Sequence, residues 1–408
     1  MRQTPKNVGA AIQRAMRAIE SANPDMLDGI FGDAPWTNRE RLPDETLKNL
    51  IEHFSTQTLS VANVPEDELG NAYEFLIKNF ASDAGRKAGE FYTPPEVSEL
   101  MAEIMDMAEG EEACDPACGS GSLLMKCGRR VLTKTGSKKY ALYGQESIGS
   151  TWALAKMNMF LHGEDNHRVE WGDTLRNPKL LDGEDRLKHF DVVVANPPFS
   201  LDKWGQENAA QDKFGRFRRG LPPRTKGDYA FILHMIETMK PKTGRMAVVV
   251  PHGVLFRGAA EGAIRRKLIE ENLLDAVIGL PEKLFYGTGI PAAILIFRKN
   301  KVDRDVLFID ASREFKPGKN QNQLTREHLD KILATYHAGE SAPKYAHLAT
   351  PEEIAGNDWN LNIPRYVDTF EEEAEIDLVA VRTERLKLKE ELAALEVKMD
   401  GYLKELGF

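Results

Sequence analysis

The segment that decides the fold is EACDPACGSGSLL, residues 112–124. A short β-rich run ends at Asp115, and Gly119 and Gly121 then let the backbone turn tightly against a ligand before a helix that presents free N–H groups to it. Turns of this kind serve nicotinamide, flavin and nucleotide sites, and some bind nothing. Asp115 narrows the choice, because a carboxylate at that point attracts an ammonium group but repels a pyrophosphate.

Short β-rich runs alternate with helical stretches from Cys114 onward, which is typical of a parallel sheet in an α/β domain. The expected strands are residues 112–116, 141–145, 168–171, 191–195, 246–250, 276–279 and 292–297. A hairpin-like turn at residues 286–289 leads into the last one. This pattern predicts a seven-stranded, doubly wound, Rossmann-like sheet of the methyltransferase type, since a plain dinucleotide fold usually has six strands. Such sheets bind ligands at the carboxyl ends of their strands.

The length of 408 residues suggests about two to three domains. We expect a helical N-terminal domain over residues 1–88, a catalytic domain over 89–310 and a helical C-terminal region over 311–408. A heptad seam marks the last region, with apolar residues in steps of four and three. It consists of Leu388, Leu392, Leu395, Met399, Tyr402 and Leu406. Periodicity shows that this face is buried but leaves open whether its own domain or a partner helix covers it.

Composition excludes several classes of protein. No apolar run approaches the roughly 18 residues of a membrane-spanning helix, and the N-terminus lacks the apolar core of a signal peptide. The cysteines, Cys114, Cys118 and Cys127, are odd in number and crowded together, which indicates a reducing cytoplasm rather than secreted disulfides. Their spacing is not that of a zinc site and no histidine is near, so no metal is expected. The net charge of −9 means that any contact with DNA requires locally concentrated positive charge.

The most specific motif is NPPF, Asn196-Pro197-Pro198-Phe199, directly after the fourth expected strand. Two prolines there stop the strand ladder and fix the loop. An adenine amino nitrogen is a poor nucleophile, because its lone pair is delocalised into the ring. The Asn196 amide oxygen and the Pro197 carbonyl can each accept one of its N–H bonds and direct the lone pair at a sulfonium methyl group. Phe199 would stack on the base, which must leave the duplex to reach the pocket.

Two further acids and a basic loop complete the candidate residues. Glu146 ends the second expected strand, where a carboxylate accepts hydrogen bonds from ribose hydroxyls. Asp173 follows the third, where it either lies near the adenine ring of a cofactor or caps the next helix. The loop after Ser200 has interleaved aromatics and is a candidate DNA contact, although most charge runs are merely solvated surface. Its basic residues are Lys213, Arg216, Arg218, Arg219, Arg224 and Lys226.

These motifs resemble the N6-adenine DNA methyltransferases, and specifically the modification subunit of type I restriction-modification systems. DPACGSG and NPPF are shared with amino-methyltransferases generally, whereas GEFYTP at 89–94, GKNQN at 318–322 and NLNIPRY at 360–366 are more particular. The similarity runs from about residue 8 to the C-terminus. It implies S-adenosyl-L-methionine as cofactor and Asn196 as the catalytic asparagine. The implied cofactor-binding residues are Glu90, Phe91, Tyr92, Thr93, Pro94, Pro95, Ser120, Ser122 and Glu146, and we add Asp115, Pro116, Ala117, Gly119, Gly121 and Asp173.

The resemblance also implies partners: double-stranded DNA, a specificity subunit held through terminal helices, and a restriction subunit bound through it. Relatives usually carry a further helical segment ahead of residue 1, so either this is a short member or its N-terminus is missing. Two alternatives remain, a solitary adenine-N6 methyltransferase and a protein-glutamine methyltransferase, which also uses an NPP-aromatic loop. The basic loop and the FYTP segment favour DNA over glutamine as the substrate.

Overall fold

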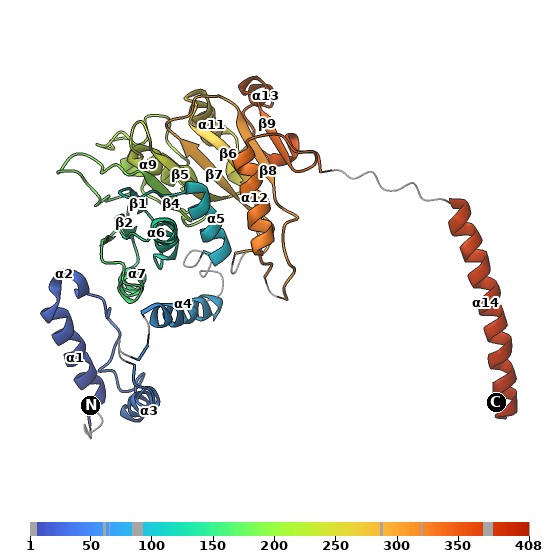
Figure 1. The fold of residues 1–408 in the computed structure, drawn as a ribbon, viewed down its shortest axis with the longest axis horizontal. Coiled ribbons are helices and arrows are strands. Elements are labelled where there is room, and N and C mark those ends of the chain that lie inside the picture. The colour runs from blue at the N-terminus through green and yellow to red at the C-terminus, as the bar shows by residue number, and fades with distance from the viewer. Residues whose placement is uncertain are drawn as a thin grey trace. The chain divides into compact units, whose positions relative to one another are not determined.

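The computed structural model describes residues 6–59, 63–64, 66–83, 93–285, 289–319, 321–369 and 378–407. The chain divides into two compact units, Met1–Asp368 and Thr369–Phe408. The first contains the N-terminal helices and the whole sheet, and the second contains one long helix (Figure 1). The two units are described separately below.

The first unit is built on one nine-stranded sheet in the order β3-β2-β1-β4-β5-β7-β6-β8-β9. Its strands are β1 (Glu112–Asp115), β2 (Ala141–Glu146), β3 (His167–Trp171), β4 (Val192–Ala195), β5 (Arg245–Pro251), β6 (Leu274–Gly279), β7 (Ala292–Arg298), β8 (Val306–Asp310) and β9 (Ala346–Ala349). Strands β3, β2, β1, β4 and β5 run parallel to one another, while β7 runs antiparallel between β5 and β6. The doubly wound sheet predicted from the sequence is therefore confirmed, and all seven expected strands are present.

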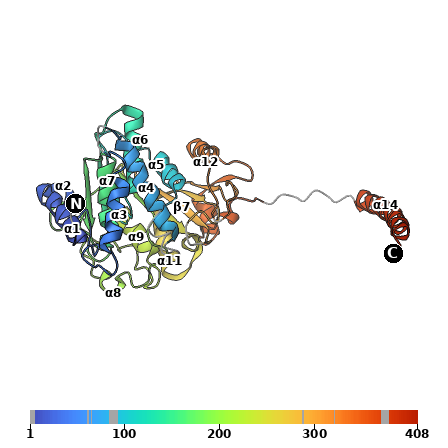
Figure 2. The same cartoon turned by 90° about the horizontal axis from the view of Figure 1, so that it is seen from below.

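Alternate residues along each strand enter two separate cores, one on each face of the sheet. Val192 and Val194 of β4 face one core and Val193 and Ala195 face the other. The first core is covered by α5 (Pro95–Met105), α6 (Ser122–Thr135), α7 (Gly149–Leu161) and α12 (Arg326–Ala338), and the second by α9 (Asp228–Thr238) and α11 (Ala259–Glu270). Figure 2 shows helices on both sides of the strands. Burial on both faces explains why the strands are continuous apolar runs.

The N-terminal helices α1 (Val8–Ala22), α2 (Pro24–Leu27), α3 (Asp44–Phe54) and α4 (Glu66–Asp83) precede the sheet. Val8, Ile12 and Leu47 form a small core of their own between α1 and α3. Helix α4 packs against α7 of the catalytic part. The helical N-terminal region expected from the apolar spacing is thus present in the described residues.

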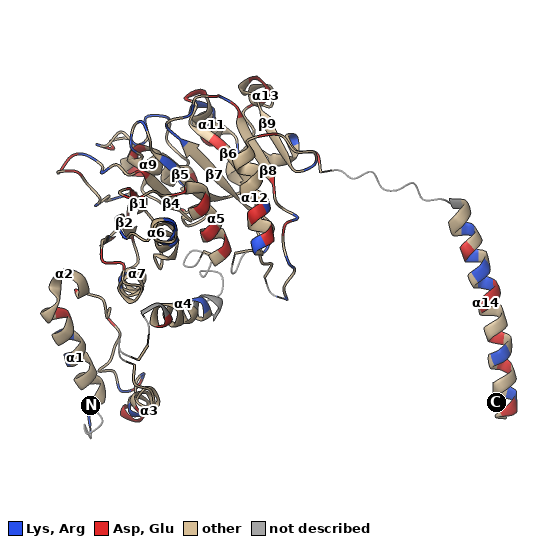
Figure 3. Cartoon of the chain, in the orientation of Figure 1, with Lys and Arg blue, Asp and Glu red and all other residues tan. Residues whose placement is uncertain are grey.

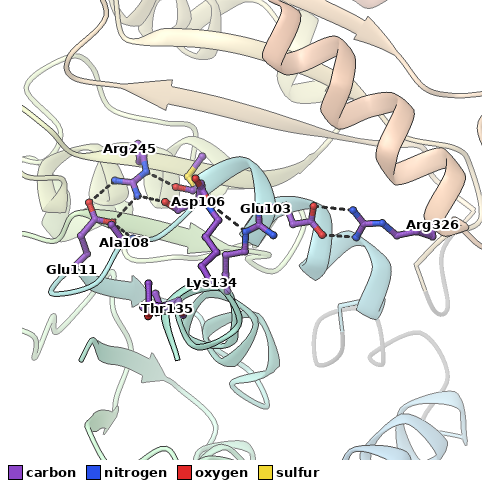
Figure 4. A network of polar contacts seen from close by, with 11 residues as sticks. Glu103, Asp106, Ala108, Glu111, Lys134, Thr135, Arg245 and Arg326 are labelled. Carbon is purple, nitrogen blue, oxygen red and sulfur yellow. Dashed lines mark hydrogen bonds and ion pairs between the residues drawn. The ribbon is translucent and has the colours of Figure 1, made fainter. Parts of the chain in front are cut away.

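Helix α5 is fixed along its length by ion pairs (Figure 4). Arg326 of α12 pairs with Glu103, its Nη2 lying 3.1 Å from Oε2. At the end of the helix, Arg245 of β5 donates to the backbone carbonyls of Met105 and Asp106 and pairs with Glu111 at 2.7 Å. Because α5 begins directly after Thr93 and Pro94, these contacts also fix the position of those two residues.

The sequence analysis missed two strands and several short helices. Strand β8 extends the sheet parallel to β6, and β9 pairs antiparallel with β8. The region from residue 311 is therefore not purely helical, because β9 lies within it. The remaining short elements are α8 (Gln206–Ala209), α10 (Gly253–Phe256), α13 (Pro351–Gly356) and the 3-10 helix η2 (Ile363–Arg365).

The second unit is the helix α14 (Leu378–Glu405), which contains the predicted heptad seam. All of its described side chains are exposed, including those of the apolar seam positions Leu388, Leu392 and Leu395. Charged residues of both signs occur along its whole length (Figure 3). Among the described residues of this unit, 369 and 378–407, nothing buries the seam.

Candidate active site

Two carboxylates occupy the carboxyl ends of neighbouring strands. Asp115 ends β1 with 2 % of its surface exposed, and Glu146 ends β2 with 8 % exposed. The backbone N–H of Ala117 donates to Asp115 at 2.9 Å. Glu146 accepts from the backbone N–H of Gly119 at 3.1 Å and of Ile148 at 2.8 Å. Glu146 therefore braces the glycine turn against the end of β2.

These two acids lack a compensating cation. Burial raises the pKa of Asp115 to about 8, and the nearby negative charge of Glu146 raises it further. Burial also raises the pKa of Glu146, against the opposing effect of its backbone hydrogen bonds. No basic side chain in the described ranges forms an ion pair with either acid. A buried pair of this kind is stabilised by a positively charged ligand.

Asn196 lies at the carboxyl end of β4, 7 % exposed. Its amide nitrogen donates to Thr93 Oγ1 at 3.1 Å. Its amide oxygen is buried, and no group in the described part of the chain donates to it. An unsatisfied buried acceptor costs about 1–3 kcal/mol, so this oxygen favours a ligand that brings an N–H group.

One pocket collects six of the residues expected to bind a cofactor, together with Asn196. It is lined by Thr93, Asp115, Ala117, Cys118, Gly119, Ser120, Ser122, Leu123 and Asn196. Gly121 forms the turn beneath it with φ +79°, and a Cβ there would lie 2.9 Å from Met159 Cε. Pro116 contributes a backbone carbonyl that accepts from Thr174. The structure thus brings the glycine turn, the end of β4 and Thr93 to a single place.

The family model described as N-6 DNA Methylase matches residues 64–375. The chain belongs to this family. It is 34 % identical over 386 residues to the type I restriction enzyme MjaVII methylase subunit of Methanocaldococcus jannaschii, covering 90 % of this chain and 64 % of that protein. It is 31 % identical to the HindI methylase subunit of Haemophilus influenzae, covering 98 % of this chain and 93 % of the relative.

A solved structure agrees with the family assignment. The type I restriction-modification methyltransferase subunit of Streptococcus thermophilus superposes with a TM-score of 0.80 at 40 % identity, over 88 % of this chain and 77 % of that one. The chain spans about two thirds of the length of the archaeal relative. This chain and the Streptococcus thermophilus subunit therefore share their fold and their family.

The rest of the NPPF motif forms the wall next to Asn196. Pro197 is buried, while Pro198 and Phe199 are half-buried. The Phe199 ring meets Phe285 edge to face with centroids 5.9 Å apart. In this member of the N-6 DNA methylase family the motif therefore leaves Phe199 partly exposed.

A buried ion pair supports the turn after NPPF, and the sequence analysis did not identify it. Ser200 has φ +53°, and its N–H donates to Asp228 Oδ1 at 2.8 Å. Asp228 is in turn paired with Arg257. The one sequence signal was an acid at the start of a helix, which is also an ordinary capping pattern.

The other residues predicted to bind the cofactor lie outside this pocket or outside the described residues. Asp173 accepts from the N–H groups of Leu175 and Arg176 at 2.9 and 3.0 Å, so its carboxylate caps the turn after β3. Pro94 and Pro95 begin α5 and line a neighbouring pocket with Gln321 and Asn322. Glu90, Phe91 and Tyr92 lie outside the described residues.

Two basic-loop residues are wrongly assigned to DNA. Arg216 is 3 % exposed, paired with Asp212 at 2.7 Å and bonded to the carbonyls of Thr174 and Leu175. Arg219 is 4 % exposed and paired with Glu237 and Glu271. The guanidinium groups of both arginines therefore bind groups within the protein. The pattern of charges in the sequence does not reveal these contacts.

The other four basic residues reach the surface. Lys213 pairs with Asp185 and Arg218 pairs with Glu237, although both remain exposed. Arg224 is exposed and Lys226 is half-buried. These four remain candidates for contact with a phosphate backbone.

The residues that the structure describes contain neither a cluster of metal ligands nor a helix that could span a membrane. No group of three or more His, Cys, Asp or Glu side chains is placed to hold a metal ion. The three cysteines are unpaired and buried, and burial raises their thiol pKa. No helix in these ranges has the length and apolarity needed to cross a membrane.

Proposed function

We propose that this chain transfers a methyl group from S-adenosyl-L-methionine to N6 of a flipped adenine in DNA, as the modification subunit of a type I restriction-modification assembly. The observation that carries the proposal is the Asn196 amide oxygen. It is buried and without a donor in the described residues, while the amide nitrogen of the same side chain donates to Thr93. An exocyclic amino group supplies the missing N–H.

The cofactor pocket supports the same proposal through its charge. S-adenosylmethionine supplies an activated methyl group and carries two positive charges, on the α-ammonium and on the sulfonium. Asp115 and Glu146 are buried acids without a basic partner in the described chain, so they fit a cation and disfavour a pyrophosphate. Asp115 would hold the ammonium, and Glu146, at the end of β2, would accept from ribose hydroxyls.

The target side follows from the NPPF turn. The Asn196 oxygen and the Pro197 carbonyl each accept one N–H bond of the amino group, which draws its nitrogen toward tetrahedral geometry. That nitrogen forms the new bond to the methyl carbon while the carbon–sulfur bond breaks and its electron pair stays on sulfur. The extra proton on nitrogen passes to solvent. Phe199 stacks on the base, so the residues act by positioning and electrostatics.

DNA and protein partners are proposed from exposed surfaces. Lys213, Arg218, Arg224 and Lys226 follow the catalytic turn in the chain, where a polyanionic substrate needs local positive charge. The exposed seam of α14 offers an apolar helix face. A specificity subunit fits this face, and a restriction subunit would join through it. We place this assembly in the cytoplasm, in keeping with the crowded free thiols.

The experiment is methyl transfer measured together with cofactor binding. The purified chain is titrated with S-adenosylmethionine by calorimetry in the presence of a chelator. It is then incubated with methyl-labelled cofactor and unmethylated DNA, alone and with a specificity subunit, and the DNA is analysed for N6-methyladenine by mass spectrometry. We expect metal-independent binding and N6-methyladenine. A strict zinc requirement, or methyl incorporation into glutamine of a protein instead of DNA, would defeat the proposal.

A further inference from the structure

A chain of hydrogen bonds links the glycine turn to the N-terminal helices. Ser122 Oγ lies 3.1 Å from Glu74 Oε1 of α4 and 3.0 Å from Ser120 Oγ. Ser120 and Ser122 both line the candidate cofactor pocket. Glu74 lies 48 residues before Ser122, in a region that the sequence assigns only to helix packing.

The position of Glu74 is set by close packing of α4 on α7. Gly70, one turn before Glu74, lies against the His162 ring so closely that a Cβ would come within 2.6 Å of its Nε2. Ile77, one turn after Tyr73 on the same face, is buried. Asn158 of α7 is fully buried, and its amide nitrogen donates to the Ser120 carbonyl at 3.0 Å. The glycine turn and Glu74 are therefore held to the same helix.

The number of available protons determines which group donates in each of these hydrogen bonds. An ionised carboxylate only accepts hydrogen bonds, so Ser122 donates its single proton to Glu74. In the contact between the two serines, Ser122 must then accept, and Ser120 must donate. The Ser122 oxygen also accepts from the Asn158 amide nitrogen at 3.5 Å. With its proton committed, Ser120 presents only lone pairs to the pocket.

We propose that Glu74 is a positioning residue that makes Ser120 a hydrogen-bond acceptor for the α-ammonium group of the cofactor. The inference rests on the proposed function and adds to it a residue outside the glycine turn. An acceptor at Ser120 matches an ammonium, which has three donors and no acceptor. A serine free to rotate would offer its proton to the pocket instead and would lose that match.

Three ligands test the proposal by calorimetry on the full chain: S-adenosylhomocysteine, its deamino analogue, and 5′-methylthioadenosine, which lacks the amino-acid end. Glu74→Ala and Ser122→Ala should each weaken S-adenosylhomocysteine binding by about 5- to 10-fold, the size of one typical net hydrogen bond. Binding of the deamino analogue and of methylthioadenosine should stay within about twofold. Glu68→Ala, an exposed glutamate of the same helix, is the matched control and should change nothing.

The double variant separates a relay from two independent contacts. If Glu74 acts through Ser122, removing both should cost no more than removing either one. Equal loss for all three ligands, additive losses, or no loss in either single variant would overturn the proposal. A wild-type chain that binds none of the ligands would instead refute the proposed function, so the two failures are distinguishable.

Discussion

The Asn196 amide nitrogen donates to Thr93 Oγ1 at 3.1 Å, joining two segments 103 residues apart. This bond turns the amide oxygen away from the threonine and leaves it as the free acceptor at the end of β4. Thr93 is itself placed by α5, which begins two residues later and is fixed by Arg245 and Arg326. The proposed catalytic asparagine is therefore held at its amide nitrogen by Thr93.

Replacing Asn196 should separate catalysis from cofactor binding. We expect Asn196→Ala to abolish methyl transfer and to leave cofactor affinity within about twofold, because its acceptor serves only the target amino group. Thr93→Val should lower kcat about tenfold, and Thr93→Ser should restore it by keeping the hydroxyl. Transfer kinetics and calorimetry on the same preparations measure both effects. If Asn196→Ala lost cofactor binding as severely as transfer, the residue would be structural.

Cofactor affinity should rise with pH between about 6 and 8. The pKa of Asp115 is raised to about 8 by burial, so in the free protein it is protonated below that pH, whereas an ammonium ligand requires the carboxylate. The expected increase is up to about tenfold per pH unit, with proton release visible as a buffer-dependent binding enthalpy. Asp115→Asn should bind weakly with little pH dependence. A flat profile for the wild-type chain would show that Asp115 is already ionised.

The stability of the chain without cofactor should fall as the pH rises, whereas its cofactor affinity rises. Because the folded pKa of Asp115 lies above its ordinary value of 3.8, this group stabilises the folded chain at acidic pH, and that contribution is lost as pH rises from about 4 through about 8. The thermal midpoint should therefore fall more between pH 6 and 9 in the wild-type chain than in Asp115→Asn.

The basic loop should divide into structural and DNA-contacting arginines. Arg224→Glu with Lys226→Glu should lower affinity for all DNA sequences alike and reduce the salt slope by about 1 for each lost phosphate contact, without changing the melting temperature. Arg216→Ala should instead destabilise the fold by about 3 kcal/mol, since it leaves buried Asp212 unpaired. Binding assays across salt concentrations, paired with thermal melts, distinguish the two. A changed target sequence in the Arg224 variant would show that the loop reads bases.

Removing α14 should abolish partner binding and spare the cofactor site. Deletion of residues 376–408 leaves the first compact unit intact, so calorimetry should give an unchanged cofactor affinity, while co-purification with the specificity subunit is lost. A milder variant, Leu388→Glu with Leu395→Glu, should act similarly because it charges the exposed seam. If the isolated full-length chain methylated one defined sequence efficiently, a solitary methyltransferase would replace the subunit assignment.

The sequence predicts those parts of the fold that a local residue pattern determines. The seven expected strands are apolar runs bounded by turns. The glycine turn and the NPPF motif each indicate the end of a strand. Strand β9 is four residues long and reads AHLA, a run too short to distinguish from helix by periodicity. Strand β8 follows a charged stretch, and its partner β6 is separated from it in the chain by β7.

Site residues that depend on long-range pairing were not predictable in the same way. Arg219 is buried against acids elsewhere in the chain, such as Glu271, 52 residues beyond it, and Arg216 donates to the carbonyls of Thr174 and Leu175. The support that Asp228 and Glu74 give to the site likewise depends on contacts between distant segments. Residue type and spacing identify which groups carry chemistry, but not which groups hold them.

The two buried acids at the strand ends also bear on turnover. Methyl transfer converts a sulfonium into a neutral thioether, so the spent cofactor has one positive charge fewer than the fresh one. In a poorly solvated pocket this difference is felt over several ångströms, and Asp115 and Glu146 hold the spent molecule less strongly. The same pair that attracts the methyl donor thereby favours its exchange once the methyl group is gone, and the product is a correspondingly weaker inhibitor.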